Sequence, residues 1–479
     1  MIQINKVKMR SSIVIDFFFH SEKSIYILLV ISALIVLPNI GRESLWLDEI
    51  FSATVTLKTS SLKLMFSEYI SNDGNPPLYY VLLFYWEKIV GASDVNLRLL
   101  SYLFTLLGFI SSYLLLQKYF TRRIAILFLS LSTFTPCVLF FAQEARMYAL
   151  LYGLTCIASI IFFVFIIRIR DNKKIERKLI VYYFCIASLI CYTHHFGSLI
   201  IVLISLVTIL YSLFLKRNTI AIEIFVISIF IGIIGSSWLV FQFYYVDMGV
   251  HIKEVSWLKN NIKSILLNFS TLLALNKFGV AVLLILLFPF LMKFSFFYKF
   301  LKGYIILLLP VLLLFFLAYF VALKIFVISE RYLIVTIPFI LLFLSFLFNE
   351  LYYSKKHNIL FYVIGLLIIS FYGNYNYEKQ NWRDAAKYIK NNFNVSNCKV
   401  PIRALKDGSF DRLMFVSYYL GSEYSYIANG PSVQNDCDLI YIDGHTNEIE
   451  IRKTLNNYNI STPYKIINFN KVYLVVKRR

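Results

Sequence analysis

The sequence predicts a polytopic α-helical membrane protein that ends in a small α/β domain, and three observations support this prediction. Hydrophobic residues make up 59% of the 479 residues and charged residues only 15%, against about 45–50% and about 25% in soluble globular proteins. Apolar stretches recur at the length of about 20 residues that a helix needs to cross the hydrocarbon core. The residues after 374 depart from this pattern. A wholly soluble fold is therefore excluded.

About eleven apolar stretches reach membrane-spanning length. We place them at residues 25–40, 97–117, 124–142, 147–167, 179–193, 197–215, 219–245, 279–292, 303–323, 332–349 and 358–373. The pair 179–193 and 197–215 could form two short spans or one kinked hairpin. The first stretch is followed by no small-residue cleavage site, so we expect a retained anchor rather than a cleaved signal peptide.

The net charge of +20 would suggest nucleic acid in a soluble chain, but in a membrane protein basic residues report topology. Lys and Arg gather in every second connection, which predicts a cytoplasmic amino terminus. The loop 41–96 instead holds four basic and seven acidic residues and is predicted to face outward. We expect a multi-pass membrane protein, with membrane lipids as partners and no nucleic acid.

The tail differs in composition from the membrane spans. Residues 382–393 have the pattern of an amphipathic helix, and the runs 437–442 and 471–476 are rich in β-forming residues. We therefore divide the chain into a membrane domain, 1–374, with the outward loop 41–96, and an extracytoplasmic α/β domain, 375–479. Cys398 and Cys437 would lie in an oxidising compartment, where they could be free or form a disulfide.

Two polar clusters lie within the outward loop. Asp48 and Glu49 are adjacent, so their side chains point in different directions in a helix or a strand, and we expect separate roles. Acidic residues capping a helix would give the same pattern. In the second cluster, Pro76 and Pro77 restrict the backbone to a rigid turn that presents Asp73 and Asn75 before an apolar helix begins.

Three further clusters lie at predicted outer ends of spans. Gln143 and Arg146 are three residues apart, so they would share one face of a helix whose amino terminus favours an anion. An arginine anchored at the membrane interface would look the same in sequence. His194 and His195 are adjacent and cannot both be ligands from one helical face, which argues against a two-histidine metal site. Arg331 follows Glu330 and could form an exposed ion pair or contact a phosphate.

At these clusters the chain resembles the GT-C membrane glycosyltransferases that use polyprenyl-phosphate sugars, namely the bacterial relatives of protein O-mannosyltransferases and of the lipid A aminoarabinose transferase (glycosyltransferase family 39-like). The resemblance covers residues from about 25 to 350 and rests on six motifs in the family's order. They are Trp-Leu-Asp-Glu at 46–49, Asn-Pro-Pro-Leu-Tyr-Tyr at 75–80, Arg-Leu-Leu-Ser at 98–101, Gln-Glu-Ala-Arg-Met-Tyr at 143–148, Tyr-Thr-His-His at 192–195 and Arg-Tyr-Leu at 331–333.

The resemblance implies a GT-C fold in the inner membrane of a bacterium, and transfer of a sugar, with inversion, to an extracytoplasmic hydroxyl of a lipid, glycan or protein. It implies that Asp48 is the catalytic carboxylate, that Glu49 supports it, and that Arg146 and Tyr148 hold the donor phosphate. Arg331 would be a second phosphate contact. Substrate-binding or supporting positions would be Asp73, Asn75, Tyr79, Gln143, His194 and His195.

A divalent cation could take part in the reaction, with Asp48 as a ligand. The family usually has His where this chain has Asn75, and an amide is a poor transition-metal ligand, so the resemblance gives that position no clear metal role.

Three other functions compete with this one. A transporter or flippase would carry ionisable residues near the bilayer midplane and often internal repeats, and the sequence has neither. A lipid-linked oligosaccharide polymerase or ligase fits the same pattern and stays open. A non-catalytic membrane scaffold is also open, and its carboxylates would tolerate replacement.

Overall fold

The computed structural model describes residues 19, 21–57, 59–70, 75–245, 294–322, 329–353, 379–392, 401–404, 417–420, 425–427, 440–444, 448–457 and 464–477. The chain forms two compact units. The helical unit comprises residues 1–37, 60–86 and 98–375, and the composite unit comprises residues 38–59, 87–97 and 376–479. The composite unit therefore joins parts of the 41–96 loop with the carboxyl-terminal tail.

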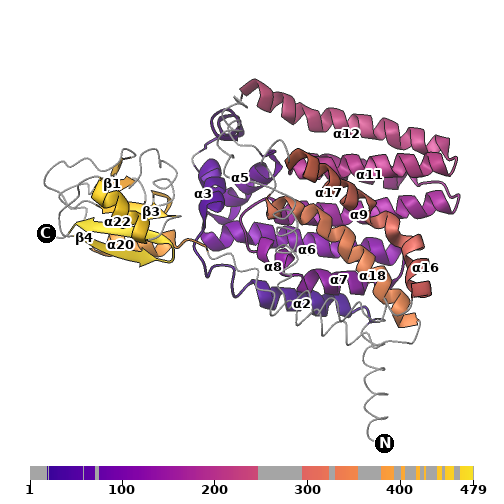
Figure 1. Ribbon diagram of the computed structural model, residues 1–479, viewed down its shortest axis with the longest axis horizontal. Coiled ribbons are helices and arrows are strands. Elements are labelled where there is room, and N and C mark those ends of the chain that lie inside the picture. Colours follow the sequence, from indigo (N-terminus) through magenta and orange to yellow (C-terminus); the bar gives the residue numbers. More distant parts are fainter. Residues whose placement is uncertain are drawn as a thin grey trace, which may run out of the picture. The chain divides into compact units, whose positions relative to one another are not determined.

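The helical unit is built from apolar helices that run side by side (Figure 1). Its elements, including two helices that begin or end in the composite unit, are α2 (Ser24–Val36), α4 (Leu62–Leu64), the π-helix η1 (Met65–Tyr69), α5 (Leu78–Val90), α6 (Asp94–Tyr119), α7 (Arg122–Phe134), α8 (Pro136–Phe141), α9 (Tyr148–Arg170), α10 (Arg177–Cys191), α11 (His195–Phe214), α12 (Asn218–Tyr245), α16 (Phe294–Tyr304), the 3₁₀ helix η3 (Ile305–Leu308), α17 (Leu309–Ala322), the 3₁₀ helix η4 (Glu330–Thr336) and α18 (Ile337–Tyr353).

Among the described residues, six helical segments are long and apolar enough to cross a membrane, at 94–119, 148–170, 195–214, 218–244, 300–320 and 331–350. The chain is therefore a multi-pass membrane protein. The predicted first span is helix α2, which has 13 residues. The predicted spans 279–292 and 358–373 lie outside the described residues.

The structure gives more detail on two regions of predicted spans. The stretch 124–142 is divided into α7 and α8 at Pro136, because Thr135 before it adopts an extended backbone, the conformation that a following proline favours. The stretches 179–193 and 197–215 are two helices, α10 and α11, joined by the turn at 192–194.

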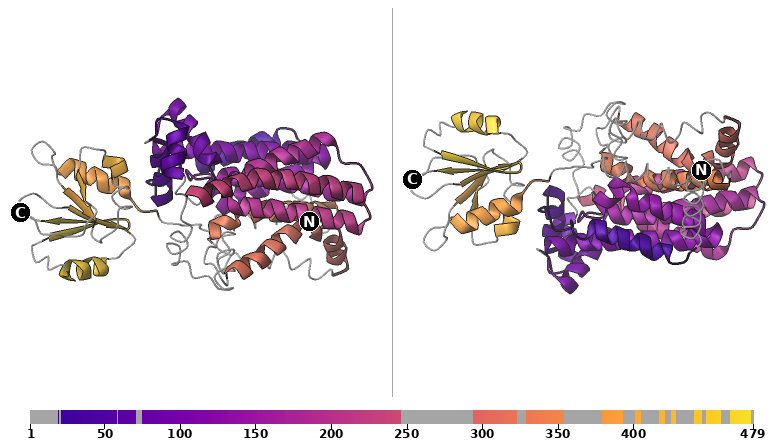
Figure 2. Two further views of the ribbon diagram at one scale, coloured as in Figure 1. Left: turned by 90° about the horizontal axis from the view of Figure 1, so that it is seen from above. Right: turned by 90° about the horizontal axis from the view of Figure 1, so that it is seen from below.

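Helix α9 lies at the centre of the helical unit. It packs against α8, α10, α11, α18 and η4. Of an 18-residue apolar stretch in each helix, 94% of the residues are buried in α9 and 17% in α12. Figure 2 shows α12 on the outside of the helices it accompanies. A helix that is apolar all round is either a core helix or lipid-facing. Helix α9 is the former and α12 the latter.

A pair of glycines lets α6 and α9 approach at backbone distance. A Cβ on Gly108 would lie 2.6 Å from the Cα of Gly153, and a Cβ on Gly153 would lie 3.1 Å from the carbonyl oxygen of Phe104. Small residues allow such close crossings between membrane helices. The contact fixes the position of α9, whose amino-terminal end begins at Tyr148.

The composite unit contains a mixed five-stranded sheet in the order β2-β1-β3-β5-β4. The strands are β1 (Pro401–Ala404), β2 (Ser425–Ile427), β3 (Ile440–Gly444), β4 (Tyr464–Phe469) and β5 (Val472–Lys477), and the helices are α3 (Leu47–Leu57), α20 (Trp382–Asn392) and α22 (Glu448–Asn457). Strands β1 and β2 and strands β1 and β3 pair in parallel, whereas β5 is antiparallel to β3 and β4. The predicted small α/β domain is confirmed.

Helix α20 and strands β3 and β5 correspond to the amphipathic helix and the two β-rich runs that the sequence predicts. Helix α20 buries Trp382, Ala385, Ala386 and Ile389 and packs on β4 and β5. A two-residue turn joins these strands, with Asn470 and Lys471 at φ of 40° and 67°, the left-handed backbone that tight hairpins require. Cys398 and Cys437 lie outside the described residues.

Candidate active site

In the helical unit, the polar residues of four sequence motifs meet at the amino-terminal end of α9. Arg146 is buried, with 5% of its surface exposed, and its Nη1 donates to the hydroxyl of Tyr80 at 3.1 Å. Its carbonyl accepts a hydrogen bond from Ser101 Oγ at 3.4 Å, and Ser101 Oγ lies 3.3 Å from the hydroxyl of buried Tyr79. Arg146 is thus contacted by two segments that are distant in sequence, by Tyr80 at the guanidinium and by Ser101 at the backbone carbonyl.

The segment around Arg146 is a turn and not the helix that the spacing of Gln143 and Arg146 predicts. Helix α8 ends at Phe141 and α9 begins at Tyr148. The amide of Arg146 donates to the carbonyl of Glu144 at 2.7 Å, a two-residue bond that an α-helix cannot contain. Gln143 Nε2 donates back to the carbonyl of Leu139 at 2.9 Å. Gln143 and Arg146 therefore do not share a helical face.

His194 forms the amino-terminal cap of α11. Its Nδ1 accepts a hydrogen bond from the amide of Phe196 at 3.1 Å, so the ring proton belongs on Nε2. Burial, together with the smaller effects of the charges of His195 and Arg146, lowers the pKa of His194 to about 3. His194 is therefore a neutral imidazole at neutral pH, with Nε2–H as its donor group.

Aromatic rings surround His194. The ring of Tyr332 lies 4.9 Å from it, and that of Tyr148 lies 6.0 Å away. Tyr332 also lies 5.2 Å from Phe196. Arg331 immediately precedes Tyr332 on η4, and both it and His195 are half-buried. The structure thus brings Arg146, Tyr148 and His194 together. Arg331 directly precedes Tyr332, whose ring lies beside that of His194.

The proline turn is joined to this cluster through the backbone. The amide of Leu78, the first residue of α5, donates to the carbonyl of Tyr192 at 3.0 Å, and Tyr192 begins the turn that ends in His194. The residue that follows Pro76 and Pro77 is thus hydrogen-bonded to the Tyr-Thr-His-His motif. Half-buried Asn75 precedes the two prolines. Asp73 lies outside the described residues.

The acidic motif belongs to the composite unit and forms the start of α3. Glu49 Oε2 accepts a hydrogen bond from the amide of Trp46 at 3.3 Å, which is the arrangement of a capping box. The same oxygen lies 3.2 Å from Nζ of Lys379, and the two side chains are 0% and 4% exposed. Asp48, by contrast, is half-buried. The two adjacent carboxylates thus have different surroundings, as the sequence predicts.

Tyr80 and Lys379 are among the residues of these clusters that were not identified as site residues from the sequence. Tyr80 lies within the Asn-Pro-Pro-Leu-Tyr-Tyr motif, directly after Tyr79. This second tyrosine is the sequence signal that could have identified it. Lys379 follows the predicted last span and is separated from Glu49 by 330 residues. No local pattern distinguishes this lysine from the other basic residues.

One expectation from the sequence is a divalent cation with Asp48 as a ligand. In the described part of the chain, no three His, Cys, Asp or Glu side chains gather where they could hold a metal ion. A divalent cation bound by Asp48 would therefore need further ligands, such as waters or the phosphate of a substrate, as Mg²⁺ commonly has.

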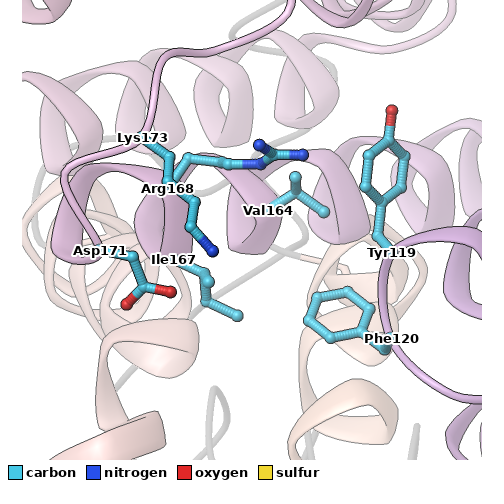
Figure 3. A pocket seen from close by; sticks show the side chains of 7 residues that line it. All are labelled: Tyr119, Phe120, Val164, Ile167, Arg168, Asp171 and Lys173. Atoms are coloured by element: carbon cyan, nitrogen blue, oxygen red, sulfur yellow. The ribbon is translucent and has the colours of Figure 1, made fainter.

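A cavity of about 190 Å³ lies at the other end of α9, lined by Tyr119, Phe120, Val164, Ile167, Arg168, Asp171 and Lys173 (Figure 3). Arg168 lies 20 positions after Tyr148, which corresponds to roughly 30 Å of helix. This cavity is therefore separate from the cluster around Arg146, and none of the motif residues lines it.

No protein-family model and no curated protein sequence matches the chain. Two crystal structures of ArnT from Cupriavidus metallidurans match it over nearly its whole length. The structure bound to undecaprenyl phosphate has a TM-score of 0.60 and 11% sequence identity, and the match covers 95% of this chain and 98% of ArnT. The apo structure has a TM-score of 0.55 and 12% identity, and the match covers 94% and 97% of the two chains. This chain therefore has the GT-C fold of ArnT, in agreement with the resemblance seen in the sequence motifs.

Proposed function

We propose that this protein is a glycosyltransferase that moves a sugar from a polyprenyl-phosphate donor to an extracytoplasmic acceptor hydroxyl, with inversion at the anomeric carbon. The observation that carries the proposal is the buried guanidinium of Arg146, which donates to the hydroxyl of Tyr80 and interacts with the neutral His194, in a membrane fold similar to that of ArnT bound to undecaprenyl phosphate. Such a group suits a lipid-linked phosphate, because arginine pairs well with phosphate oxygens.

In this proposal, the charge that develops during transfer determines the roles of the residues. Departure of polyprenyl phosphate from C1 passes through an oxocarbenium-like state and places negative charge on the phosphate. Arg146, with Tyr148 and Arg331 as further contacts, would stabilise that charge, and one such preorganised donor commonly contributes about 2.7–4 kcal/mol. The neutral His194 could donate a hydrogen bond from Nε2. Tyr79, Gln143, Asn75 and His195 would support the site, with Asp73.

Asp48 would act as the general base that takes the proton from the acceptor hydroxyl, a role typically worth about 10²–10⁴ in rate. Its half-buried position is compatible with access to an acceptor. Glu49 is fully buried and hydrogen-bonded to the start of its own helix, so it would support Asp48 rather than react. One displacement from the face opposite the phosphate inverts the anomeric centre.

The proposed location follows from the chemistry of the donor. A sugar attached to a membrane lipid can react outside the cytoplasm, where nucleotide sugars are absent. The 41–96 loop and the carboxyl-terminal domain would then lie outside the inner membrane. Reporter fusions after Asp73 and after Glu378 should both indicate the outer side, and a cytoplasmic signal from either would contradict this topology.

Mass spectrometry of surface glycoconjugates tests the function directly. Cells that lack the protein, or that carry only Asp48→Asn, should lose one sugar residue from one class of acceptor, and the wild-type protein should restore it. The mass of the missing residue names the sugar, and the molecule that loses it names the acceptor. Identical glycoconjugates with and without the protein would contradict the proposal.

A further inference from the structure

The first residues of the carboxyl-terminal tail hold the segment that leads into the acidic motif, within the composite unit. Ser44 Oγ donates to the carbonyl of Gln380 at 2.7 Å and accepts from the amide of Trp382 at 3.2 Å. The amide of Leu45 donates to the hydroxyl of Tyr419 at 2.8 Å. These bonds join residues more than 330 positions apart in the chain. The segment before α3 is thus fixed by the tail and not by its sequence neighbours.

The strand hairpin fixes Lys379 in turn. Asn470, in the turn between β4 and β5, donates from its side-chain amide to the carbonyl of Lys379 at 3.1 Å. Its own carbonyl accepts from the amide of Asn381 at 3.3 Å. The backbone of Lys379 is therefore attached to the sheet, and its side chain extends to Glu49 Oε2 at 3.2 Å.

The Lys379–Glu49 pair is almost completely removed from solvent. Breaking a buried ion pair by removing one partner leaves an uncompensated buried charge, which is far more costly than losing an exposed pair. Loss of the Lys379 cation favours uptake of a proton by buried Glu49, or its movement toward water. Either change disturbs the capping box with Trp46, and therefore the first turn of α3, which carries Asp48.

We infer that Lys379 is a positioning residue for the acidic motif, so that the carboxyl-terminal domain completes the active site by neutralising Glu49 and fixing the helical turn that presents Asp48. This inference rests on the proposed function, in which Asp48 is the general base. It adds a residue from the tail to a site whose sequence motifs all lie before residue 350. The geometry requires a cation at position 379, because the partner carboxylate is buried.

The test is a set of substitutions at this pair in the full-length protein, assayed for transfer from a polyprenyl-phosphate sugar and for thermal unfolding. Lys379→Met should lower kcat by about 10–100-fold, the scale of a small misplacement of a catalytic group, and should leave the KM for the donor within about twofold. Lys379→Arg keeps the charge and should recover most of kcat. The matched control is Lys387→Met, which changes an exposed lysine of α20 and should match the wild type.

A double variant distinguishes positioning through Glu49 from an unrelated structural role. Lys379→Met with Glu49→Gln removes both charges, so it should unfold at a higher temperature than Lys379→Met alone. The inference is overturned if Lys379→Met retains wild-type kcat, or if the two substitutions lower the unfolding temperature additively. If wild-type protein transfers no sugar from any polyprenyl-phosphate donor while the unfolding data still show coupling, the proposed function fails and the structural role of Lys379 stands.

Discussion

The two polar centres of this chain are held together in different ways. Around Arg146, hydroxyl groups and a neutral imidazole from separate apolar helices meet at the buried start of α9. At the acidic motif, a buried carboxylate meets a buried lysine contributed by the far end of the chain. The first centre depends on helix packing within the helical unit, whereas the second depends on the tail.

This difference suggests a division of work between the two centres. A site for the donor phosphate needs a fixed cation near the membrane, and the packed helices provide rigid support for it. A base that receives different acceptor hydroxyls needs a carboxylate that solvent and substrate can reach, and Asp48 meets that need while Glu49 does not. Substitutions in each centre test whether the two can be disturbed separately.

The largest expected effect is at Asp48. Asp48→Asn should reduce transfer by at least about 10²–10⁴-fold, because the amide cannot accept the acceptor's proton. Thermal unfolding should stay close to that of the wild type, since Asp48 is half-buried. Glu49→Gln is the comparison variant. It leaves Lys379 buried without its charge partner and should lower the unfolding temperature. Loss of stability in Asp48→Asn with unchanged turnover would contradict the assignment.

Arg146 should give the next largest effect. Arg146→Ala should reduce kcat/KM by about 10²–10³-fold and weaken binding of undecaprenyl phosphate, which can be measured by titration of the purified protein. The control is Arg170→Ala, at the opposite end of α9, where the arginine is exposed and paired with Asp171. Equal losses of donor and acceptor binding in Arg146→Ala would indicate a structural arginine.

Much of the first centre could be predicted from the sequence, because polar residues at the ends of apolar spans are conspicuous. Arg146 and His194 were identified in this way and Tyr148 through the family resemblance, and the structure brings the three together. The helical face expected for Gln143 and Arg146 was wrong because the Glu144–Arg146 bond closes a tight turn. Spacing alone does not distinguish a helix start from the turn that precedes it.

The second centre was predictable only in part. The Asp48–Glu49 pair is visible in sequence, and the separate surroundings of the two carboxylates follow from their adjacency. Lys379 could not be found, because its partner is 330 residues away and the contact depends on a hairpin turn at Asn470. Contacts of this kind arise from tertiary structure and leave no periodicity in the chain.

A packing substitution should disturb the first centre without touching its polar residues. Gly108→Ala places a Cβ 2.6 Å from the backbone of Gly153, so α6 and α9 must separate, at a cost of about 1–3 kcal/mol. Because Ser101 of α6 contacts the carbonyl of Arg146, we also expect weaker undecaprenyl phosphate binding. Gly232→Ala, on α12 with no neighbour within 4 Å, is the control, and its stability should be unchanged or slightly higher. Equal unfolding temperatures for both variants would contradict the close crossing.

The smallest effect concerns a second buried carboxylate of the composite unit. Glu87 accepts a hydrogen bond from Thr56 Oγ1 at 2.7 Å, and burial raises the pKa of its carboxyl from 4.5 to about 7, although the Thr56 bond opposes this shift. The folded state therefore binds more protons than the unfolded state between these two values, so the free energy of unfolding should fall as the pH rises from about 4.5 to about 7. Glu87→Gln keeps an acceptor for Thr56 and removes the titration, so its unfolding temperature should fall less than that of the wild type across this window. An identical pH dependence in the two proteins would show that Glu87 is not the group that titrates.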